Sequence, residues 1–532
     1  MGRICLIFVA ALIAGILEAC QHGCECPQRT IAICRGNHNL RSVPILLDPR
    51  TTVLDLSHNR ISRLSADELS LYPNLEKLVL RNNSITHLSS DVFATLSKLE
   101  YLDLSSNSLL SLPNNAFAKL KNLKTLIVSS NDVQFGPECF AGLSSLETLE
   151  LADNRLSFLP PSVLKPLTSL RKLDLSSNKL LSMPASLLSS VPSLHSLVLK
   201  QNLLSNLETG MFRTQKSLRR LDLAENLIGD IEEDALYGLE QLQVLNLTAN
   251  QLIRLPGNTW SLPSLKVLDI SANLFVALET ASFDGLPNLE YLNISMSRNL
   301  KTIQMSSFVQ LDALHWLSLA NSTLSHIHPQ AFDVVPPLRH LDLSANELRG
   351  LPSGLLAWHN IKTMKLRNNQ WVCSCDLRAL QLRAIDEPQC VGPENLKGAV
   401  LSELSSCTLL GGLLIPILLA VFILLLALII LALACKRPTK SKSRAFYNDQ
   451  LIAALASHKE YSYDCHSPYT MSSEDSRDSA YESPTSALMP RAPPPSAPPP
   501  RLVIATMPRA VPPPQVPSTS SNDPYLVPMT RL

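Results

Sequence analysis

The cysteines offer the clearest chemistry in this sequence, because eight of them stand in two compact groups of four. The first group is Cys20, Cys24, Cys26 and Cys34, and the second is Cys373, Cys375, Cys390 and Cys407. Even-numbered groups are typical of disulfides, which form and persist in an oxidising compartment. Spacing alone leaves three pairings open within each group. Cys139 stands apart from both groups, and we expect it to be a buried free thiol.

Chemistry of other kinds is sparse. The chain has no glycine-rich phosphate loop, no nucleophile elbow and no H-E-x-x-H motif, so we expect no enzyme and no cofactor. His315, His326 and His328 lie close together, but no cysteine or carboxylate accompanies them at metal-ligand spacing, so no metal site is expected. The formal net charge of +1 gives no indication of a nucleic-acid partner. Four N-x-S/T sequons predict N-linked glycans at Asn82, Asn246, Asn293 and Asn321.

The elements that position these residues are repeats. The pattern L-x-L-x-x-N, or a close variant of it, occurs fourteen times at a spacing of 23 to 25 residues. It reads LDLSSN at Asn107 and again at Asn178, while Ser297 and Ser322 replace the asparagine in two other copies. Such a period is typical of a solenoid, in which each unit buries its apolar face only against its neighbours.

The repeated unit predicts its own structure. Each L-x-L segment should form a short strand with alternate residues inward and outward, and neighbouring strands should pair in parallel into one curved sheet. The asparagines should form a ladder of buried, hydrogen-bonded amides where the chain leaves each strand. The second half of each unit returns along the convex side to the start of the next strand. A phenylalanine recurs at one position of this returning half and predicts an aromatic spine, formed by Phe93, Phe117, Phe140, Phe283, Phe308 and Phe332.

The ends of a solenoid expose apolar edges unless they are capped, and the two cysteine groups stand where caps are required. Upstream, Arg3 and the apolar run from Ile4 to Leu17 are typical of a secretory signal peptide. Downstream, the apolar run from Leu409 to Ala434 is long enough to span a bilayer. Basic residues follow this run, so the positive-inside rule predicts a single-pass type I protein of the plasma membrane with its N-terminus outside.

The sequence therefore divides into six expected parts. Residues 1–19 form a signal peptide, 20–51 a cysteine-rich N-terminal cap, and 52–369 the repeats. Residues 370–407 form a cysteine-rich C-terminal cap, 409–435 a transmembrane helix, and 436–532 a disordered cytoplasmic tail.

Two flanking motifs carry a family resemblance. The spacing C-x3-C-x-C-x7-C begins at Cys20, and N-x-W-x-C-x-C-D-x-x-x-L begins at Asn369. With these motifs around the repeats, the chain resembles the extracellular leucine-rich-repeat family with cysteine-rich caps. Membrane-anchored members, such as the Capricious/Tartan type and the neuronal leucine-rich-repeat transmembrane proteins, share the plan. The resemblance implies an α/β solenoid, a horseshoe of about 14 repeats, with bridges Cys373–Cys390 and Cys375–Cys407.

Members of this family typically bind other proteins through the concave sheet. An acidic residue between the two strand leucines recurs there and would attract a basic partner. We favour the interpretation that the acidic residue is simply part of the usual repeat sequence. Basic neighbours such as Arg171 and Arg219 would screen the negative field of the acidic residues. Glycans at Asn246 and Asn293 would obstruct the later repeats, so we expect the ligand on the N-terminal half of the concave face, near Asp55, Asp103, Glu150, Asp174 and Asp222.

The tail offers docking motifs rather than a folded domain. The ending Thr530-Arg531-Leu532 is a ligand pattern for PDZ scaffolds, which capture a chain end by strand addition. The tract PPPSAPPPR is either a ligand for SH3-like domains or a plain linker, which we favour. Six tail tyrosines are candidate sites for phosphotyrosine readers, and Cys435 is a candidate palmitoylation site.

Together these features predict a membrane-embedded recognition or adhesion receptor. It would bind an extracellular or cell-surface protein and recruit cytoplasmic scaffolds. The alternative is a co-receptor or sink for a secreted signalling ligand. The identity of the ligand, binding to a second copy of the chain, the oligomeric state and the sites that are modified stay open at this point.

Overall fold

The computed structural model describes residues 20–21, 23–36, 39–256, 260–332, 338–351, 361–374, 377, 385–403 and 411–434. All of them belong to the compact unit Met1–Cys435, and the second unit, Lys436–Leu532, lies outside the described residues. The signal peptide, Cys375, Cys407, Cys435 and the tail motifs, including Thr530, Arg531 and Leu532, lie outside them as well.

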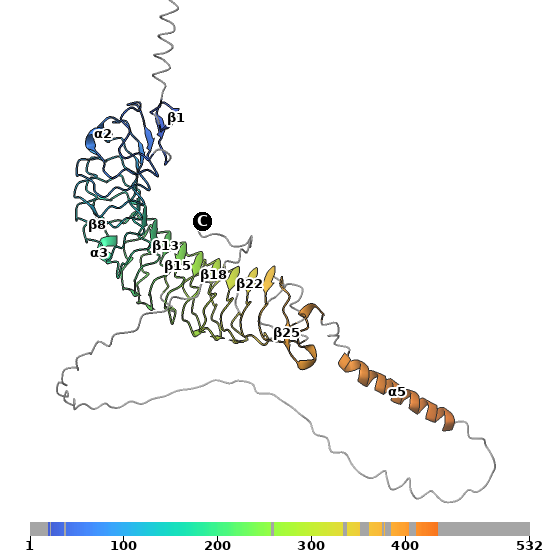
Figure 1. Ribbon diagram of the computed structural model, residues 1–532. Coiled ribbons are helices and arrows are strands. Elements are labelled where there is room, and N and C mark those ends of the chain that lie inside the picture. Colours follow the sequence, from blue (N-terminus) through green and yellow to red (C-terminus); the bar gives the residue numbers. More distant parts are fainter. Residues whose placement is uncertain are drawn as a thin grey trace, which may run out of the picture. The chain divides into compact units, whose positions relative to one another are not determined.

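A single parallel sheet runs the length of the solenoid (Figure 1) and contains one strand from each of fourteen turns. In spatial order these strands are β3 (Val53–Asp55), β4 (Lys77–Val79), β5 (Tyr101–Asp103), β7 (Thr125–Ile127), β9 (Thr148–Glu150), β10 (Lys172–Asp174), β11 (Ser196–Val198), β13 (Arg220–Asp222), β15 (Val244–Asn246), β16 (Val267–Asp269), β18 (Tyr291–Asn293), β20 (Trp316–Ser318), β22 (His340–Asp342) and β23 (Thr363–Lys365). We number the turns 1 to 14 in this order. The predicted solenoid of about 14 repeats is confirmed.

The returning half of each turn is built mainly of turns and two-residue strands. The small sheets are β6 (Ser111–Leu112) with β8 (Gln134–Phe135), β12 (Asn206–Leu207) with β14 (Asp230–Ile231), and β17 (Ala277–Leu278) with β19 (Thr302–Ile303) and β21 (His326–Ile327). Among the described residues of the returning half, helix is limited to α2 (Ala66–Ser70) and α3 (Ala185–Leu188). A period of about 24 residues leaves little chain for a longer helix once the strand and its two corners are made.

The core follows from the alternation along each strand. The central residue is leucine in thirteen of the fourteen strands and Met364 in β23, and all of these side chains are buried. Leu173 of β10 pairs in register with Leu149 of β9 and Leu197 of β11, so equivalent residues stack along the solenoid. The first and third residues of each strand point to the other side of the sheet, which lines the inner side of the arc in Figure 1.

The asparagine ladder is confirmed, and Asn202 shows its geometry. This side chain is 4% exposed. Its Nδ2 donates to the carbonyl of Leu199 in its own turn at 3.0 Å and to that of Leu175 in the preceding turn at 3.0 Å. Its Oδ1 accepts from the N–H of Leu180 at 3.0 Å. The same bonds join neighbouring turns at Asn59, Asn83, Asn107, Asn131, Asn154, Asn178, Asn226, Asn250, Asn273, Asn346 and Asn369.

Turns 11 and 12 interrupt this ladder. The hydroxyl of Ser297 donates its one hydrogen to the carbonyl of Ile294 in its own turn at 2.9 Å, so it has none for the preceding turn. The hydroxyl of Ser322 accepts from the N–H of Ser297 at 3.2 Å and lies 3.4 Å from the carbonyl of Ala320. At the ladder position these turns are therefore joined by fewer side-chain hydrogen bonds than their neighbours. The hydroxyl of Thr323 adds bonds from turn 12 to the carbonyls of Arg298 at 2.9 Å and Leu300 at 3.3 Å in turn 11.

The convex side contains the predicted phenylalanines as two separate stacks. The rings of Phe93 and Phe117 lie 5.9 Å apart at 13°. Phe308 stacks between Phe283, at 5.8 Å, and Phe332, at 4.9 Å. Phe140 instead tilts against Phe135 at 5.5 Å. The spine is confirmed at both ends, while the corresponding column between the stacks contains leucines such as Leu164 and Leu188 together with Phe212, which the sequence analysis did not include.

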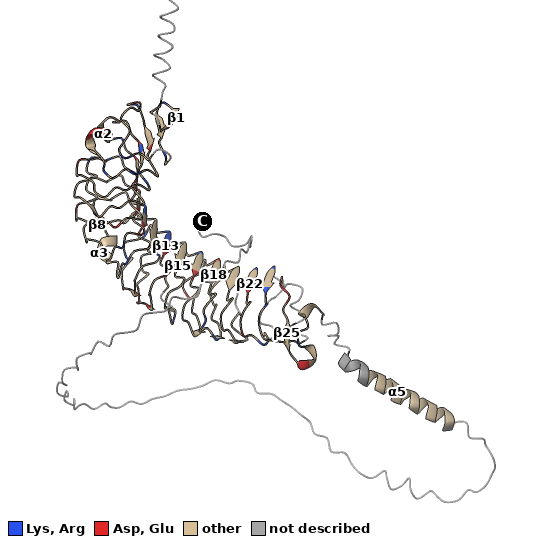
Figure 2. Ribbon diagram, in the orientation of Figure 1, with Lys and Arg blue, Asp and Glu red and all other residues tan. Residues whose placement is uncertain are grey.

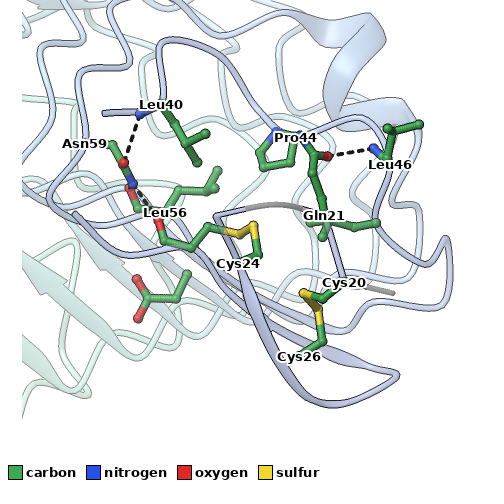
Figure 3. Close-up of a disulfide and its surroundings, with 12 residues drawn as sticks. Cys20, Gln21, Cys24, Cys26, Leu40, Pro44, Leu46, Leu56 and Asn59 are labelled. Atoms are coloured by element: carbon green, nitrogen blue, oxygen red, sulfur yellow. Dashed lines mark hydrogen bonds between the residues drawn. A yellow bond between two sulfur atoms is a disulfide. The ribbon is translucent and has the colours of Figure 1, made fainter. Parts of the chain in front are cut away.

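The N-terminal cap closes the first edge of the sheet. Strands β1 (Glu25–Gln28) and β2 (Ile31–Ile33) form an antiparallel pair, and β2 pairs in parallel with β3. Disulfides join Cys20 to Cys26 and Cys24 to Cys34 (Figure 3). Cys34 is buried, and its N–H donates to the carbonyl of Asp55 at 2.7 Å, so the second bridge is part of the core.

The C-terminal cap closes the other edge. It contains β24 (Trp371–Val372), β25 (Cys390–Gly392) and the short 3-10 helices η3 (Glu394–Leu396) and η4 (Leu401–Glu403). A disulfide joins Cys373 to Cys390, the pairing that the family resemblance implies. The carboxylate of Asp386 accepts from the N–H of Leu366 at 2.9 Å, which has no following turn to bind. It also accepts from the N–H of Arg367 at 2.7 Å, whose counterparts, such as Ser105, donate to the aspartate of their own strand. The buried Trp371 donates from Nε1 to the carbonyl of Leu366 at 2.8 Å.

The last described element is α5 (Gly411–Ala434), a helix of 24 residues whose large apolar side chains from Ile417 to Leu433 are exposed. Within the described part of the chain, no helix qualifies as long and apolar enough to cross a membrane.

One core position is occupied by a polar side chain, and replacing it should stabilise the fold. Gln215 of turn 7 is fully buried where turns 6 and 8 have Val191 and Leu239. Its Nε2 donates to the carbonyl of Leu188 at 2.8 Å, but its Oε1 is the one buried side-chain oxygen or nitrogen without a partner in the described structure. The N–H of Val191 also donates to the carbonyl of Leu188 at 2.9 Å, so Gln215→Leu should leave that carbonyl with a hydrogen-bond partner. We expect the free energy of unfolding to rise by about 1 kcal/mol in a denaturant titration.

The exposed Gln241→Leu serves as the control for this prediction, and it should change the free energy of unfolding by less than about 0.5 kcal/mol. A loss of stability in Gln215→Leu would contradict the prediction and indicate that the amide oxygen is solvated in the folded protein.

Candidate functional site

The outward positions of the concave sheet are the natural place to search, beginning with the acidic column. Asp55, Asp103 and Asp222 are only 6%, 6% and 9% exposed. Each carboxylate accepts a backbone N–H two residues on, as Asp103 does from Ser105 at 2.9 Å, and therefore closes the turn that follows the strand. Asp174 is half-buried and does the same with Ser176 at 2.9 Å.

The acidic column is also compensated by cations. The Nζ of Lys172 lies 2.8 Å from Oε1 of Glu150, and the Nη2 of Arg35 lies 2.7 Å from Oδ2 of Asp55. Burial opposes ionisation of Asp55, but hydrogen bonds from Ser57 and Arg35 outweigh it and lower the pKa of this carboxyl. Burial raises the pKa of Asp222. Figure 2 shows both signs of charge interspersed along the solenoid. This geometry favours the interpretation that the acidic residues belong to the usual sequence of the repeat and have a structural role, which is to close the turn after each strand.

A different group of residues, which the sequence did not single out, forms a distinct feature of this face. Tyr291, Trp316 and His340 begin β18, β20 and β22, three neighbouring strands. The rings of Tyr291 and Trp316 stack with centroids 3.8 Å apart at 12°. The Nδ1 of His340 lies 2.6 Å from the hydroxyl of Thr363. All three side chains are half-buried, and burial raises the pKa of Tyr291. We call Tyr291, Trp316 and His340 the aromatic patch.

Cations border the aromatic patch. His315, Arg339 and Lys362 stand immediately before β20, β22 and β23. Arg339 and Lys362 are exposed. Partial burial lowers the pKa of His340, and the positive charges of His315, Lys362 and Arg339 add to this effect, so His340 lies in a positive field. Stacked rings with a cationic border suit a partner that offers an apolar or aromatic side chain beside a carboxylate.

The four sequons fall into two classes. Asn82 and Asn321 are exposed and precede the ladder position with φ of 54° and 52°. Asn246 and Asn293 are the half-buried third residues of β15 and β18. The Nδ2 of Asn293 donates to Asp269 at 2.9 Å. The two concave amides are therefore less accessible than the other two, and glycans at all four remain predictions.

The remaining candidates are separated in space. Cys139 is buried as a free thiol, and burial raises its pKa to about 12. His315 stands beside the concave sheet, whereas His326 belongs to β21 on the returning half. Across the described residues, no group of three or more His, Cys, Asp or Glu side chains is placed to hold a metal ion.

Comparison with known families and proteins adds to this geometry. The family model described as leucine rich repeat matches residues 73–133, 134–180, 192–252, 256–298 and 296–348. The NT-3 growth factor receptor of Gallus gallus is 36% identical over 85 residues, which are 16% of this chain and 10% of the receptor. The Homo sapiens receptor is 35% identical over 85 residues with the same coverage. The chain thus matches about a tenth of the length of these curated relatives.

Solved structures extend the likeness to about two thirds of the chain. A leucine-rich-repeat protein of Leptospira interrogans superimposes with a TM-score of 0.52 at 28% identity, over 65% of this chain and 92% of that one. The leucine-rich-repeat domain of APL1 gives 0.53 at 25% identity, over 65% and 88%. A chain of the LRIM1/APL1C complex gives 0.52 at 26% identity, over 62% and 60%.

Proposed function

We infer, from the chain's place among the leucine-rich-repeat proteins, that it is a cell-surface recognition receptor that binds another protein through its concave sheet. The observation that carries this proposal is the aromatic patch with its cationic border. Aromatic and arginine side chains dominate the binding energy of protein interfaces, and here they converge on one part of the concave sheet. Because Asn293 ends the strand that Tyr291 begins, the proposal requires that Asn293 carries no glycan.

The comparisons support protein recognition as the general activity. The NT-3 growth factor receptor is a receptor by name, and LRIM1 and APL1C form a complex. Partners of those proteins are not carried over to this chain. The proposed partner is defined by chemistry instead, as a protein segment with an apolar or aromatic side chain beside carboxylates.

We propose further that the segment around α5 anchors the chain in the plasma membrane. The helix of 24 residues is about 36 Å long, which exceeds a hydrocarbon core of about 30 Å. The described side chains from Ile417 to Leu433 cover only about 26 Å of it, and the apolar sequence on either side supplies the rest. Lys436 and Arg437 follow the helix in sequence, which supports a type I orientation.

Recruitment of scaffolds by the tail belongs to the same proposal and rests on sequence alone. A PDZ-type terminus, a proline tract, tail tyrosines and Cys435 are its elements. The second candidate function is a co-receptor or sink for a secreted ligand, and it uses the same concave surface.

A binding screen with one substitution tests the proposed function. Cells displaying the full chain are screened against cell-surface and secreted proteins, and each hit is measured again with Trp316→Ala. We expect the dissociation constant to rise at least about 10-fold, because the substitution removes the centre of the aromatic patch. Thr125→Ala, at the first position of β7, is the matched control and should bind as the wild type does.

The outcomes separate the candidates. Membrane-bound hits support recognition between cells, whereas hits confined to secreted factors support the co-receptor. If Glu150→Ala rather than Trp316→Ala abolishes binding, the ligand uses the N-terminal half of the concave face and the aromatic patch is not the site.

A further inference from the structure

A row of exposed apolar side chains lies outside the concave sheet, on the flank of the solenoid just after the ladder. Leucine, isoleucine and valine are usually buried in a solenoid of this kind, yet here six of them are 39 to 62% exposed. They occur in five consecutive turns, 6 to 10, at the first or third position after the ladder asparagine. We call this row the lateral stripe: Leu181, Leu203, Leu227, Ile253, Leu274 and Val276.

Backbone hydrogen bonds bring members of the lateral stripe side by side within two groups of turns. The N–H of Leu203 donates to the carbonyl of Leu180 at 3.0 Å, which places Leu203 beside Leu181. In the same way, Leu227 donates to Leu204 at 2.9 Å and Leu274 donates to Leu252 at 2.9 Å. The flank therefore presents two apolar segments, in turns 6 to 8 and in turns 9 and 10. The exposed Gln251, whose N–H donates to the carbonyl of Ile228 at 2.9 Å, stands beside Leu227 between them. Exposed apolar segments of this kind mark sites of association.

Charges of both signs surround the lateral stripe, and the exposed Lys179 stands at its end in turn 6. Arg254 pairs with Asp230 at 3.3 Å and Lys200 pairs with Glu225 at 2.9 Å, both between neighbouring turns. The exposed sequons Asn82 and Asn321 lie in turns 2 and 12, beyond either end of the stripe. Neither a field of one sign nor a glycan at these two sequons would keep a second protein away from it.

We propose that the lateral stripe binds a second copy of this chain, with the two solenoids running in opposite directions. Asp230 and Arg254 occupy equivalent places, four residues after the ladder asparagines of turns 8 and 9. A two-fold axis between these turns sets Asp230 of each copy against Arg254 of the other. Copies running in the same direction would set each of these charges against its like, so charge complementarity selects the opposed arrangement.

Shape agrees with the same axis. The axis sets Leu203 against Leu274 of the second copy, Ile253 against Gly229, and Leu227 against the exposed Gln251. Gly229 does not need glycine for its backbone, because its φ is not positive, and the nearest atom to an added Cβ would be the carbonyl oxygen of Gln251 at 3.9 Å. The missing side chain leaves room for Ile253 of the second copy. This contact goes beyond the proposed function, which concerns the concave sheet.

The test is a charge-exchange cycle on the full chain in detergent micelles, with the mass measured by sedimentation equilibrium over a range of concentrations. We expect the wild type to dimerise reversibly. Asp230→Arg should raise the dimer dissociation constant at least about 10-fold, because it sets two arginines together across the axis. The double exchange Asp230→Arg with Arg254→Asp should restore it. The intrachain pair is exposed, so its loss alone should not unfold the protein.

A second pair of variants tests the apolar contact. Leu203→Glu should leave the protein monomeric, whereas Leu71→Glu, an equally exposed leucine outside the lateral stripe, should dimerise as the wild type does. A wild type that is monomeric at every concentration overturns the proposal. So does a dimer that ignores Asp230→Arg and Leu203→Glu, because such a dimer is held together elsewhere, for example by α5. Ligand binding at the aromatic patch is measured separately, so failure of either proposal leaves the other testable.

Discussion

Asn202→Ala should lower the free energy of unfolding by about 3 kcal/mol, because one side chain supports the backbone of two turns. The carbonyls of Leu175 and Leu199 each keep a second donor, Asn178 and Asn226 respectively. The N–H of Leu180 keeps none from the ladder, and a buried N–H without an acceptor is the costly part of the change. Denaturant unfolding followed by circular dichroism measures the loss.

The neighbouring Gln201→Ala is the matched control. Gln201 is exposed, and its bonds to Ser177 and Glu225 lie on the surface. Its φ is positive, but alanine occupies the same position with the same conformation at Ala249 and Ala345, so the backbone tolerates it. We expect a change below about 0.5 kcal/mol. Equal losses in the two variants would show that the ladder amide contributes no more than a surface amide.

The double substitution Cys24→Ala with Cys34→Ala should lower the free energy of unfolding by about 2 to 4 kcal/mol. It should also release the N-terminal cap from the first edge of the sheet. Cys34 is buried against β3, and its bridge to Cys24 holds the cap on turn 1. Removing an end cap exposes the apolar face of the terminal unit, so unfolding should begin there. Amide hydrogen exchange should accelerate first in β2 and β3 and leave the central turns protected.

The other bridge provides the comparison. Cys20 and Cys26 are six residues apart, against ten for Cys24 and Cys34, and Cys26 is exposed. A shorter loop removes less entropy from the unfolded chain, so Cys20→Ala with Cys26→Ala should cost less and leave β3 protected. Uniform acceleration of exchange along the solenoid in either variant would contradict a local role for the cap.

Periodicity accounts for the parts of the fold that the sequence predicts. Asn202 and Leu197 recur at fixed distances, and a repeated unit has one way of stacking, so strand, ladder and core follow together. Asp386 could not be predicted in the same way. It lies outside the repeats, and its bonds to Leu366 and Arg367 depend on where the chain turns after the last strand.

The candidate site was predicted less well than the fold, for a similar reason. The acidic column was visible because it repeats, but Asp55 and Asp103 proved to be caps of their own turns. Tyr291 and Trp316 are single departures from the pattern, and only the register of neighbouring strands shows that they stack. Residues that recur in every repeat determine the scaffold, whereas residues that depart from the repeat determine the surface that is specific to this protein. The likeness to the Capricious/Tartan type stays a prediction.

The interrupted ladder has a mechanical consequence. A receptor that is anchored through α5 and bound to a partner at the aromatic patch, as proposed, would carry tension through the turns between these two points, 11 to 14. An asparagine shares that load between two turns, but the hydroxyls of Ser297 and Ser322 transmit less of it. Under stretching, the ladder should therefore open first between turns 11 and 12, in the part of the solenoid that carries Tyr291 and Trp316, and the load should then pass to the bonds from Thr323 to Arg298 and Leu300. Pulling hard enough would then separate the two stacked rings and weaken the grip of the proposed site.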